Sequence, residues 1–320
     1  MTSRFIDEGA FVEINKLEQW VCIRGKKPDH PVLLILSGPG VALSAIAPFF
    51  EPWEQHFTLA FWDQPGSGAT YAQNPDGQPE LNLARLVDDG VAVCEYLKQR
   101  LQLEKLALLG ISAGSIVGLQ MVQQRPELFS AYIGTGQFVN WAQQDAVGYE
   151  KLLAKAQAES DVEAERQLLE IGPPPYSDAA TDAIKSTYHS ALTGAEQAMV
   201  PVFSALMTEA LTNPPADAGY IPAGLTLVNP RELAMHAYGA MRSELVGFDA
   251  WQMPMVFRVP MFFFQGDHDF YSVTSVVEQY VSDITAPVKN TVEIEDGSHS
   301  VFWQRERFLA ELKRHVVPLL

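Results

Sequence analysis

The chain has 320 residues, 47% of them hydrophobic and 19% charged, which suffices for a large core and excludes an intrinsically disordered protein. Acidic side chains (39) outnumber basic ones (22), and the formal net charge of −17 makes nucleic acid and anionic membranes poor partners. Two cysteines, Cys22 and Cys94, are too few for a disulfide framework and lack the spacing of metal ligands.

The N-terminal residues carry acids where a secretory signal peptide has its apolar stretch. The longest apolar stretch, residues 32–50, is interrupted by Ser37-Gly38-Pro39-Gly40, so it does not predict a membrane span. We therefore expect a soluble, cytoplasmic, globular protein. Its length fits either two domains or one large α/β domain with an insertion, and the sequence indicates no oligomeric state.

Short hydrophobic stretches predict the strands of a sheet. Residues 11–15 and 19–24 alternate apolar and polar side chains, which is typical of a half-buried antiparallel hairpin. The later stretches are almost continuously apolar and therefore predict strands that helices cover on both faces. They are residues 32–36, 57–62, 106–109, 131–133, 261–264 and 291–294. Helical periodicity at 82–101, 115–124 and 305–316 favours a doubly wound α/β fold.

The alternation of strands and helices stops between Gln137 and Gly247. This segment is rich in Ala, Gln, Glu and Met, which predicts a helical insertion. Helical patterns lie near residues 149–170 and 230–245, and proline-rich breaks lie at 172–175 and 213–215. We predict a core domain of residues 1–136 and 248–320, with residues 137–247 as a separate helical domain.

A candidate nucleophile lies in Gly110-Ile111-Ser112-Ala113-Gly114, which matches the G-x-S-x-G pattern between a predicted strand and a predicted helix. In this pattern the serine occupies a sharp, strained turn, and the flanking glycines let the strand and helix approach closely. We predict that Ser112 is a nucleophile. The alternative is a structural turn with an idle serine.

A nucleophilic serine needs a base, and the base needs an acid that orients it. With this turn the chain order is serine, acid, histidine. Among seven histidines, His299 lies in a Gly-Ser-His turn directly after a late predicted strand, so we predict that it is the base. The strand at 261–264 leads into Asp267 and Asp269. We predict Asp269 as the acid, and Asp267 remains the alternative, otherwise stabilising its own turn.

A place for developing negative charge follows the first core strand. The loop Leu36-Ser37-Gly38-Pro39-Gly40 begins where this strand ends. We predict that the backbone N–H groups of Gly38 and Ala113 form an oxyanion hole. We expect no cofactor and no metal, because Gly66-Ser67-Gly68 lacks the lysine of a phosphate loop and no His, Cys and Asp cluster has metal-ligand spacing.

Together these motifs resemble those of the α/β-hydrolase superfamily, and within it the proline iminopeptidase-like peptidases. The loop Leu36–Gly40 is similar to the family's His-Gly-Gly-Pro-Gly, and Asp63-Gln64-Pro65-Gly66-Ser67-Gly68 to its Asp-Gln-Arg-Gly-x-Gly. The elbow at Ser112, the acid turn at Asp269 and the late histidine turn also match. Leu36, Ser37 and Pro65 depart from the family pattern. The resemblance implies a mostly parallel central sheet flanked by helices, with the insertion as a helical cap.

The resemblance also implies a serine hydrolase that forms an acyl-enzyme and releases N-terminal residues, often proline, from small peptides or amides. Such a substrate carries an ammonium group, and Glu232 and Glu244, late in the insertion, are candidates to bind it. The alternative for each glutamate is a solvated helix face. Two other functions remain open: a carboxylesterase that acts on small hydrophobic esters, and a non-catalytic receptor of the same fold that binds a small molecule.

Overall fold

The computed structural model describes residues 5–176, 181, 184–185, 187–188, 198–212, 220–222 and 228–320. Its strands are β1 (Ile6–Ile14), β2 (Leu17–Gly25), β3 (Val32–Leu36), β4 (Thr58–Asp63), β5 (Leu106–Ile111), β6 (Phe129–Thr135), β7 (Met261–Gly266) and β8 (Lys289–Ile294). The α-helices of the described residues are α1 (Gly68–Gln73), α2 (Leu83–Leu101), α3 (Ala113–Gln124), α4 (Trp141–Ala158), α5 (Val162–Ile171), α8 (Val200–Thr212), α9 (Pro230–Val246), α10 (Thr274–Asp283) and α11 (Arg305–His315). Short 3₁₀ segments are η1 (Leu43–Gln55), η2 (Pro126–Leu128), η3 (Ala250–Gln252), η4 (Val301–Trp303) and η5 (Val317–Leu319).

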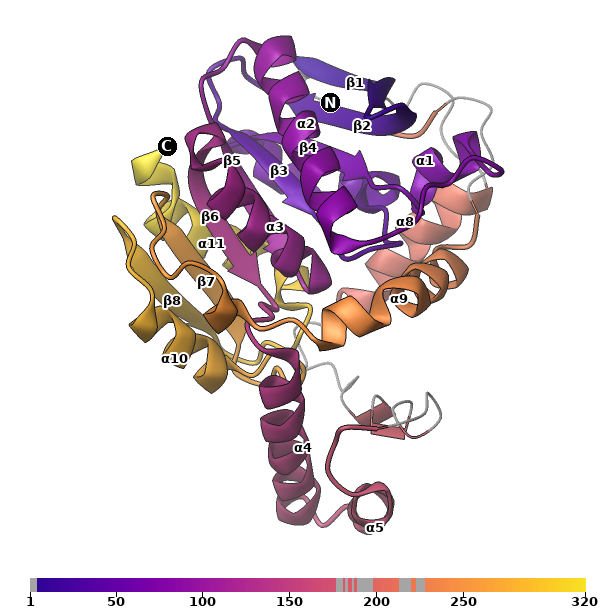
Figure 1. Ribbon diagram of the computed structural model, residues 1–320, viewed down its shortest axis with the longest axis vertical. Coiled ribbons are helices and arrows are strands. Elements are labelled where there is room, and N and C mark those ends of the chain that lie inside the picture. The colour runs from indigo at the N-terminus through magenta and orange to yellow at the C-terminus, as the bar shows by residue number, and fades with distance from the viewer. Residues whose placement is uncertain are drawn as a thin grey trace.

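The strands form one sheet in the order β1-β2-β4-β3-β5-β6-β7-β8 (Figure 1). β2 pairs antiparallel with β1 and with β4, and the pairs from β4 to β8 are parallel. The predicted N-terminal hairpin and the mostly parallel sheet are therefore confirmed. In a parallel sheet the carboxyl ends of the strands meet at one edge, so the loops after β3, β5, β7 and β8 lie along the same edge.

Alternate residues of the central strands face two separate apolar clusters. Along β3, Leu34 and Leu36 belong to a cluster that also contains residues of α2, α3 and α10. Leu33 and Ile35 belong to the other cluster, together with residues of η1 and α11. Figure 1 shows α2 and α3 in front of the sheet and α11 behind it. Because helices cover both faces, these strands are apolar at almost every position.

The segment η1 is an element that the sequence did not predict. Pro48 and Pro52 lie inside it, and Ile46 has a non-helical φ of −116°, so no regular helical period is present. Its side chains nevertheless fill the second apolar cluster. Phe50 and Trp53 are fully buried, and the Trp53 ring stacks on Phe308 of α11 with centroids 5.4 Å apart.

The described residues between β6 and β7 form the predicted helical insertion. Helices α4 and α5 extend away from the sheet (Figure 1), whereas α8 packs against η1 and α9 contacts α4. The helical pattern at 149–170 belongs to two helices, because Ser160 between them adopts a φ of 58°. α5 ends before the predicted break at 172–175, and the break predicted at 213–215 lies outside the described residues. The boundaries of the two domains remain a prediction.

A buried polar network joins the N-terminal hairpin to α2. The Asp89 carboxylate is fully buried and accepts hydrogen bonds from Asn15 Nδ2 (2.6 Å), Gln19 Nε2 (2.8 Å) and Arg85 Nε (2.7 Å). Gln19 Oε1 in turn accepts a hydrogen bond from Trp62 Nε1 on β4 (2.8 Å). Removing the carboxylate would take an acceptor from the buried amide of Gln19, from the partly exposed Arg85 and from the exposed Asn15, and the loss at the buried amide destabilises the fold most.

We expect Asp89→Ala to lower the free energy of unfolding by about 2–4 kcal/mol, because Asn15, Gln19 and Arg85 lose their common acceptor. The measurement is urea unfolding followed by circular dichroism. Asp88→Ala is the matched control, since Asp88 is exposed and accepts one hydrogen bond from Gln124. This control should change the free energy of unfolding by no more than about 0.5 kcal/mol. Equal effects of the two substitutions would contradict the prediction.

Candidate active site

Ser112 occupies a sharp turn between β5 and α3. Its φ of 55° and ψ of −133° are a backbone conformation that residues with side chains rarely adopt. The Ser112 N–H donates a hydrogen bond to Thr135 O (2.9 Å), which fixes the turn against β6. The flanking positions must be glycine: a Cβ on Gly114 would overlap the Ser37 carbonyl, and a Cβ on Gly110 would lie 2.9 Å from Ser115 Cα.

The structure brings Ser112, His299 and Asp269 together in one hydrogen-bonded chain. Ser112 Oγ lies 2.8 Å from His299 Nε2, and His299 Nδ1 lies 3.0 Å from Asp269 Oδ2. The three residues come from the loops after β5, β8 and β7, which share the carboxyl edge of the sheet. In this geometry the Asp269 carboxylate can accept the Nδ1–H of His299, which leaves Nε2 free to accept the proton of Ser112.

Asp269 favours its ionised form although its side chain is fully buried. Burial acts to raise the pKa of Asp269, but His299 and hydrogen bonds from Ser272 outweigh burial and hold this pKa below its usual value. The backbone N–H groups of Tyr271 (2.8 Å) and Ser272 (2.9 Å) donate to Oδ1, and the Ser272 hydroxyl donates to Oδ2. An anion held in this way can stabilise a protonated His299.

Asp267 has a different set of partners. Its Oδ1 accepts a hydrogen bond from the Gly297 N–H (3.0 Å) and lies 2.8 Å from His268 Nδ1. The backbone N–H of His268 donates to the Gly297 carbonyl (2.8 Å). The sequence suggested that Asp267 would stabilise its own turn, whereas here its carboxylate joins the loop after β7 to the turn that carries His299.

Gly38 lies beside Ala113 at the first turn of α3. A Cβ placed on Gly38 would lie 3.5 Å from Ala113 Cβ and 3.8 Å from Ala113 N. The loop is held by Ser37, whose hydroxyl donates to Val41 O and whose carbonyl accepts from Gln64 Nε2 (2.8 Å). Two adjacent backbone segments above a serine can provide the paired N–H donors of an oxyanion hole, and the assignment of Gly38 and Ala113 remains a prediction.

The motif that begins at Asp63 is arranged around the buried carboxylate of that residue. The Asp63 carboxylate is fully buried and accepts hydrogen bonds from the Ser44 hydroxyl (2.6 Å) and the Ala69 N–H (2.8 Å). Burial raises the pKa of Asp63 to about 6, although these two hydrogen bonds act in the opposite direction. A Cβ on Gly68 would overlap the Asp63 carboxylate, so the motif needs a glycine there.

An aromatic wall that the sequence analysis did not single out lies against His299. The ring centroids of Tyr271 and Phe138 are 5.0 Å and 5.8 Å from the His299 ring. Trp141 of α4 stacks on Phe138 with centroids 4.2 Å apart, and Tyr238 of α9 lies 6.2 Å from Trp141. The wall therefore joins two helices of the insertion to the candidate base. Its members share no period, so no sequence pattern marks them.

Glu232 and Glu244, the predicted ammonium-binding candidates, both lie exposed on α9. Glu244 Oε2 accepts a hydrogen bond from the Leu83 N–H (3.0 Å), so this carboxylate contacts the first residue of α2. Glu232 lies in the first turn of α9, where the helix dipole stabilises a negative charge. Among the contacts of the described residues, neither carboxylate reaches Ser112 or His299.

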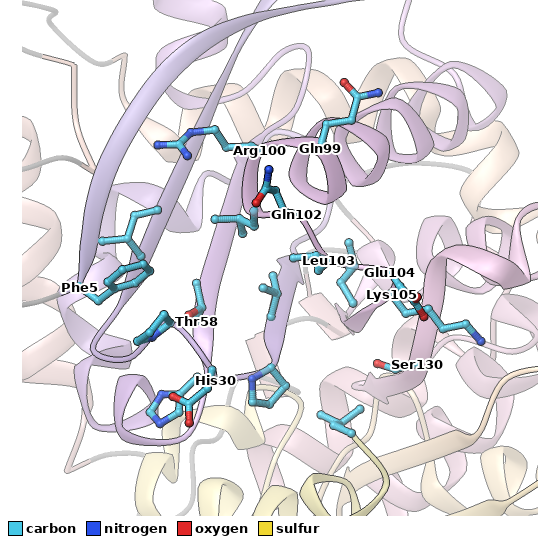
Figure 2. Close-up of a pocket in the computed structure, with 18 of the residues that line it drawn as sticks. Phe5, His30, Thr58, Gln99, Arg100, Gln102, Leu103, Glu104, Lys105 and Ser130 are labelled. Carbon is cyan, nitrogen blue, oxygen red and sulfur yellow. The ribbon is translucent and has the colours of Figure 1, made fainter.

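A separate cavity of about 1020 Å³ lies at the opposite edge of the sheet (Figure 2). Its wall includes Val32, Thr58 and Leu106, which begin β3, β4 and β5. His30 and Arg100 also line it. Because the strands begin here and Ser112 follows the carboxyl end of β5, the cavity is not part of the candidate active site.

Two further features concern the described part of the chain. It contains no group of three or more His, Cys, Asp or Glu side chains that could hold a metal ion. Among the helices of the described residues, none is both long enough and apolar enough to cross a membrane.

Comparisons with known proteins agree with this architecture. The family profile described as alpha/beta hydrolase fold matches residues 30–306. The probable aminopeptidase YbaC of Bacillus subtilis (strain 168) is 26% identical over 307 residues, which is 95% of this chain and 94% of that protein. The solved structure of a proline iminopeptidase-related protein of Thermus thermophilus, TTHA1809, matches with a TM-score of 0.64 at 19% identity, covering 99% of this chain and 100% of its own. The structure of VinJ matches with a TM-score of 0.65 at 16% identity and the same coverage.

We expect a fluorophosphonate to label Ser112 rapidly, because its hydroxyl lies 2.8 Å from an imidazole that can accept its proton. Mass spectrometry of the labelled protein locates the modified residue. Ser112→Ala should abolish rapid labelling. Ser282→Ala is the control, since Ser282 is exposed on α10 and its hydroxyl donates to the Gln279 carbonyl (2.7 Å), and this variant should keep rapid labelling. Rapid labelling of Ser112→Ala would refute the assignment.

Proposed function

The chain belongs to the α/β-hydrolase fold family, and on that basis we propose that it is a serine hydrolase that forms an acyl-enzyme at Ser112. The α/β-hydrolase fold expected from the sequence is confirmed by the family match and the structural similarity. The observation that supports the proposal best is the chain of contacts from Ser112 Oγ through His299 to the buried Asp269 carboxylate. This is the arrangement that activates a serine hydroxyl at neutral pH.

In the proposed reaction, His299 Nε2 accepts the Ser112 proton while Oγ attacks a substrate carbonyl carbon. The N–H groups of Gly38 and Ala113 would bind the resulting oxyanion. His299 then donates the proton to the leaving amine or alkoxide as its bond to the carbonyl carbon breaks. His299 next accepts a proton from a water molecule as the water oxygen attacks the acyl carbon, and it donates that proton to Ser112 Oγ as the acyl–Oγ bond breaks. Asp269 orients the imidazole and stabilises its protonated form.

Within this reaction class we favour release of an N-terminal residue from a small peptide or amide. Similarity to YbaC over nearly the whole chain supports this substrate class. The motifs at Leu36–Gly40 and Asp63–Gly68 support it as well, since they resemble those of proline iminopeptidase-like peptidases. The ammonium group of such a substrate needs a carboxylate on the insertion. Glu232 is the better of the two candidates, because Glu244 already accepts a hydrogen bond from the Leu83 N–H.

A specific observation favours a carboxylesterase as the second candidate function. The wall beside His299 consists of the aromatic rings of Phe138, Trp141, Tyr238 and Tyr271. A small hydrophobic ester could bury its apolar part against such rings and would bring no charge that needs a partner. The two functions use the same reacting groups and differ in what the insertion must recognise.

Asp269→Asn should keep the fold and lower kcat on an activated ester by several orders of magnitude. The amide favours the wrong tautomer of the His299 imidazole, and a related triad loses about 10⁴-fold from the same change. Asp267→Asn is the control, because its carboxylate contacts Gly297 and His268, and its loss should cost much less. Steady-state kinetics measures both. A larger loss in Asp267→Asn would move the acid role to Asp267.

Masking the substrate's amino group distinguishes the two candidate functions. If a carboxylate binds the ammonium, N-acetylation of an aminoacyl arylamide should lower kcat/KM by about 10- to 100-fold, the value of one charge-assisted contact. Glu232→Gln should lose a similar factor on the free amine alone, and Glu244→Gln is the matched control on the same helix. Equal cleavage of masked and free substrates would reject the aminopeptidase and leave the esterase.

A further inference from the structure

Ser272 contacts both the candidate acid and the candidate base. It is fully buried, and its hydroxyl donates a hydrogen bond to Asp269 Oδ2. Ser272 Oγ also lies 3.5 Å from His299 Nδ1. The same carboxylate oxygen, Oδ2, lies 3.0 Å from His299 Nδ1, against 3.2 Å for Oδ1. The serine hydroxyl and the imidazole therefore share one oxygen of Asp269.

The side-chain amide of Gln265 fixes the direction of the Ser272 hydroxyl. Gln265 is fully buried at the end of β7, and its Nε2 donates to the Ser272 carbonyl (2.7 Å) and lies 3.3 Å from Ser272 Oγ. An amide nitrogen can only donate, so Ser272 Oγ accepts in this contact. The hydroxyl proton is then left to point at Asp269.

The same amide reaches the start of the helical insertion. Gln265 Oε1 accepts a hydrogen bond from the Gln137 N–H (2.9 Å), which also fixes which end of the amide is the oxygen. The preceding residue, Gly136, has a φ of 53°, and a Cβ on it would lie 3.0 Å from His299 Cε1. Gln265 therefore joins the segment that lies against His299 to the residue that holds Asp269.

We propose that Ser272 is a positioning residue for Asp269, with its hydroxyl held in the donating orientation by Gln265. The proposal rests on the proposed serine-hydrolase function. Rotation of the Asp269 carboxylate would break the contacts of Oδ2 with Ser272 and His299 together, so the hydroxyl resists that rotation. The positive end of the O–H dipole also reduces the attraction of the carboxylate for a proton on His299. Without the hydroxyl, the carboxylate should attract that proton more strongly, and modification of Ser112 should need a higher pH.

Few other titratable groups of the described residues lie against this pair. Asp267 and His268 lie 2.8 Å from one another on the loop after β7, and Asp267 also binds the Gly297 N–H. The Tyr271 ring lies 5.0 Å from His299. We expect these groups to keep their positions when the Ser272 hydroxyl alone is removed, because none of their contacts named here involves it, so a change in the pH profile would report on Ser272.

The experiment measures the rate at which a fluorophosphonate modifies Ser112 between about pH 5 and about pH 9. This rate depends on neutral His299 and needs no knowledge of the natural substrate. For Ser272→Ala we expect the plateau rate to fall about 5- to 20-fold. The acid limb of the pH–rate profile should move to higher pH by about 0.5–1 unit. Ser272→Cys keeps a weak S–H donor, so its plateau rate and acid limb should lie between those of the wild type and Ser272→Ala.

Thr274→Val is the matched control. Thr274 is buried, and its hydroxyl donates to the Gly266 carbonyl (3.0 Å) in the same loop. This variant should lower the midpoint of thermal unfolding and leave the acid limb in place. The positioning role would be overturned if folded Ser272→Ala and Ser272→Cys both kept the wild-type plateau rate and acid limb. It would also be overturned if Thr274→Val shifted the acid limb by the same amount as Ser272→Ala. If the wild-type protein is not modified, the proposed function fails first, and the positioning role fails with it.

Discussion

The backbone turn at Ser112 is held in a strained conformation by the close approach of β5, α3 and the loop after β3. Gly110 and Gly114 permit this approach, because any side chain at either position would overlap neighbouring backbone. The Ser112 N–H bond to Thr135 then ties the turn to β6. The strain places the serine hydroxyl above the edge of the sheet, and its direction toward His299 depends on that placement.

The cost of burying a carboxylate beside this turn is met by hydrogen bonds rather than by exposure to water. Asp269 has donors on both oxygens, so its charge persists in a buried position. The loop after β7 binds the histidine turn through Asp267, and Gln265 of β7 itself binds the insertion. The candidate acid, the candidate base and the first residues of the insertion are therefore connected by one set of buried polar contacts. A displacement of any one of these groups would change the hydrogen bonds of the others.

In the proposed reaction, selectivity must come from outside these contacts, since the proposed reacting groups would recognise the tetrahedral oxyanion common to all acyl substrates. The aromatic wall is the structural link between the reaction site and the helices of the insertion. Phe138 follows β6 by three residues and its N–H donates to the Ser115 hydroxyl, whereas Trp141 and Tyr238 belong to α4 and α9. A displacement of these two helices would change the surface that faces the substrate while Ser112 and His299 stay in place.

Local sequence was enough to predict the sheet and to single out Ser112 and His299 as candidates. The central strands are apolar at almost every position because helices cover both faces. The two candidate residues lie in turns that their neighbours in the sequence mark, Gly110 and Gly114 around Ser112 and Gly297 before His299. What depends on distant contacts emerged only in the folded chain. Folding gave Asp269 and Asp267 their different partners, and it brought Ser272 and the aromatic wall to His299. It also packed η1, whose prolines erase any helical period. Such contacts join residues as far apart in the chain as Trp53 and Phe308, and no local pattern records them.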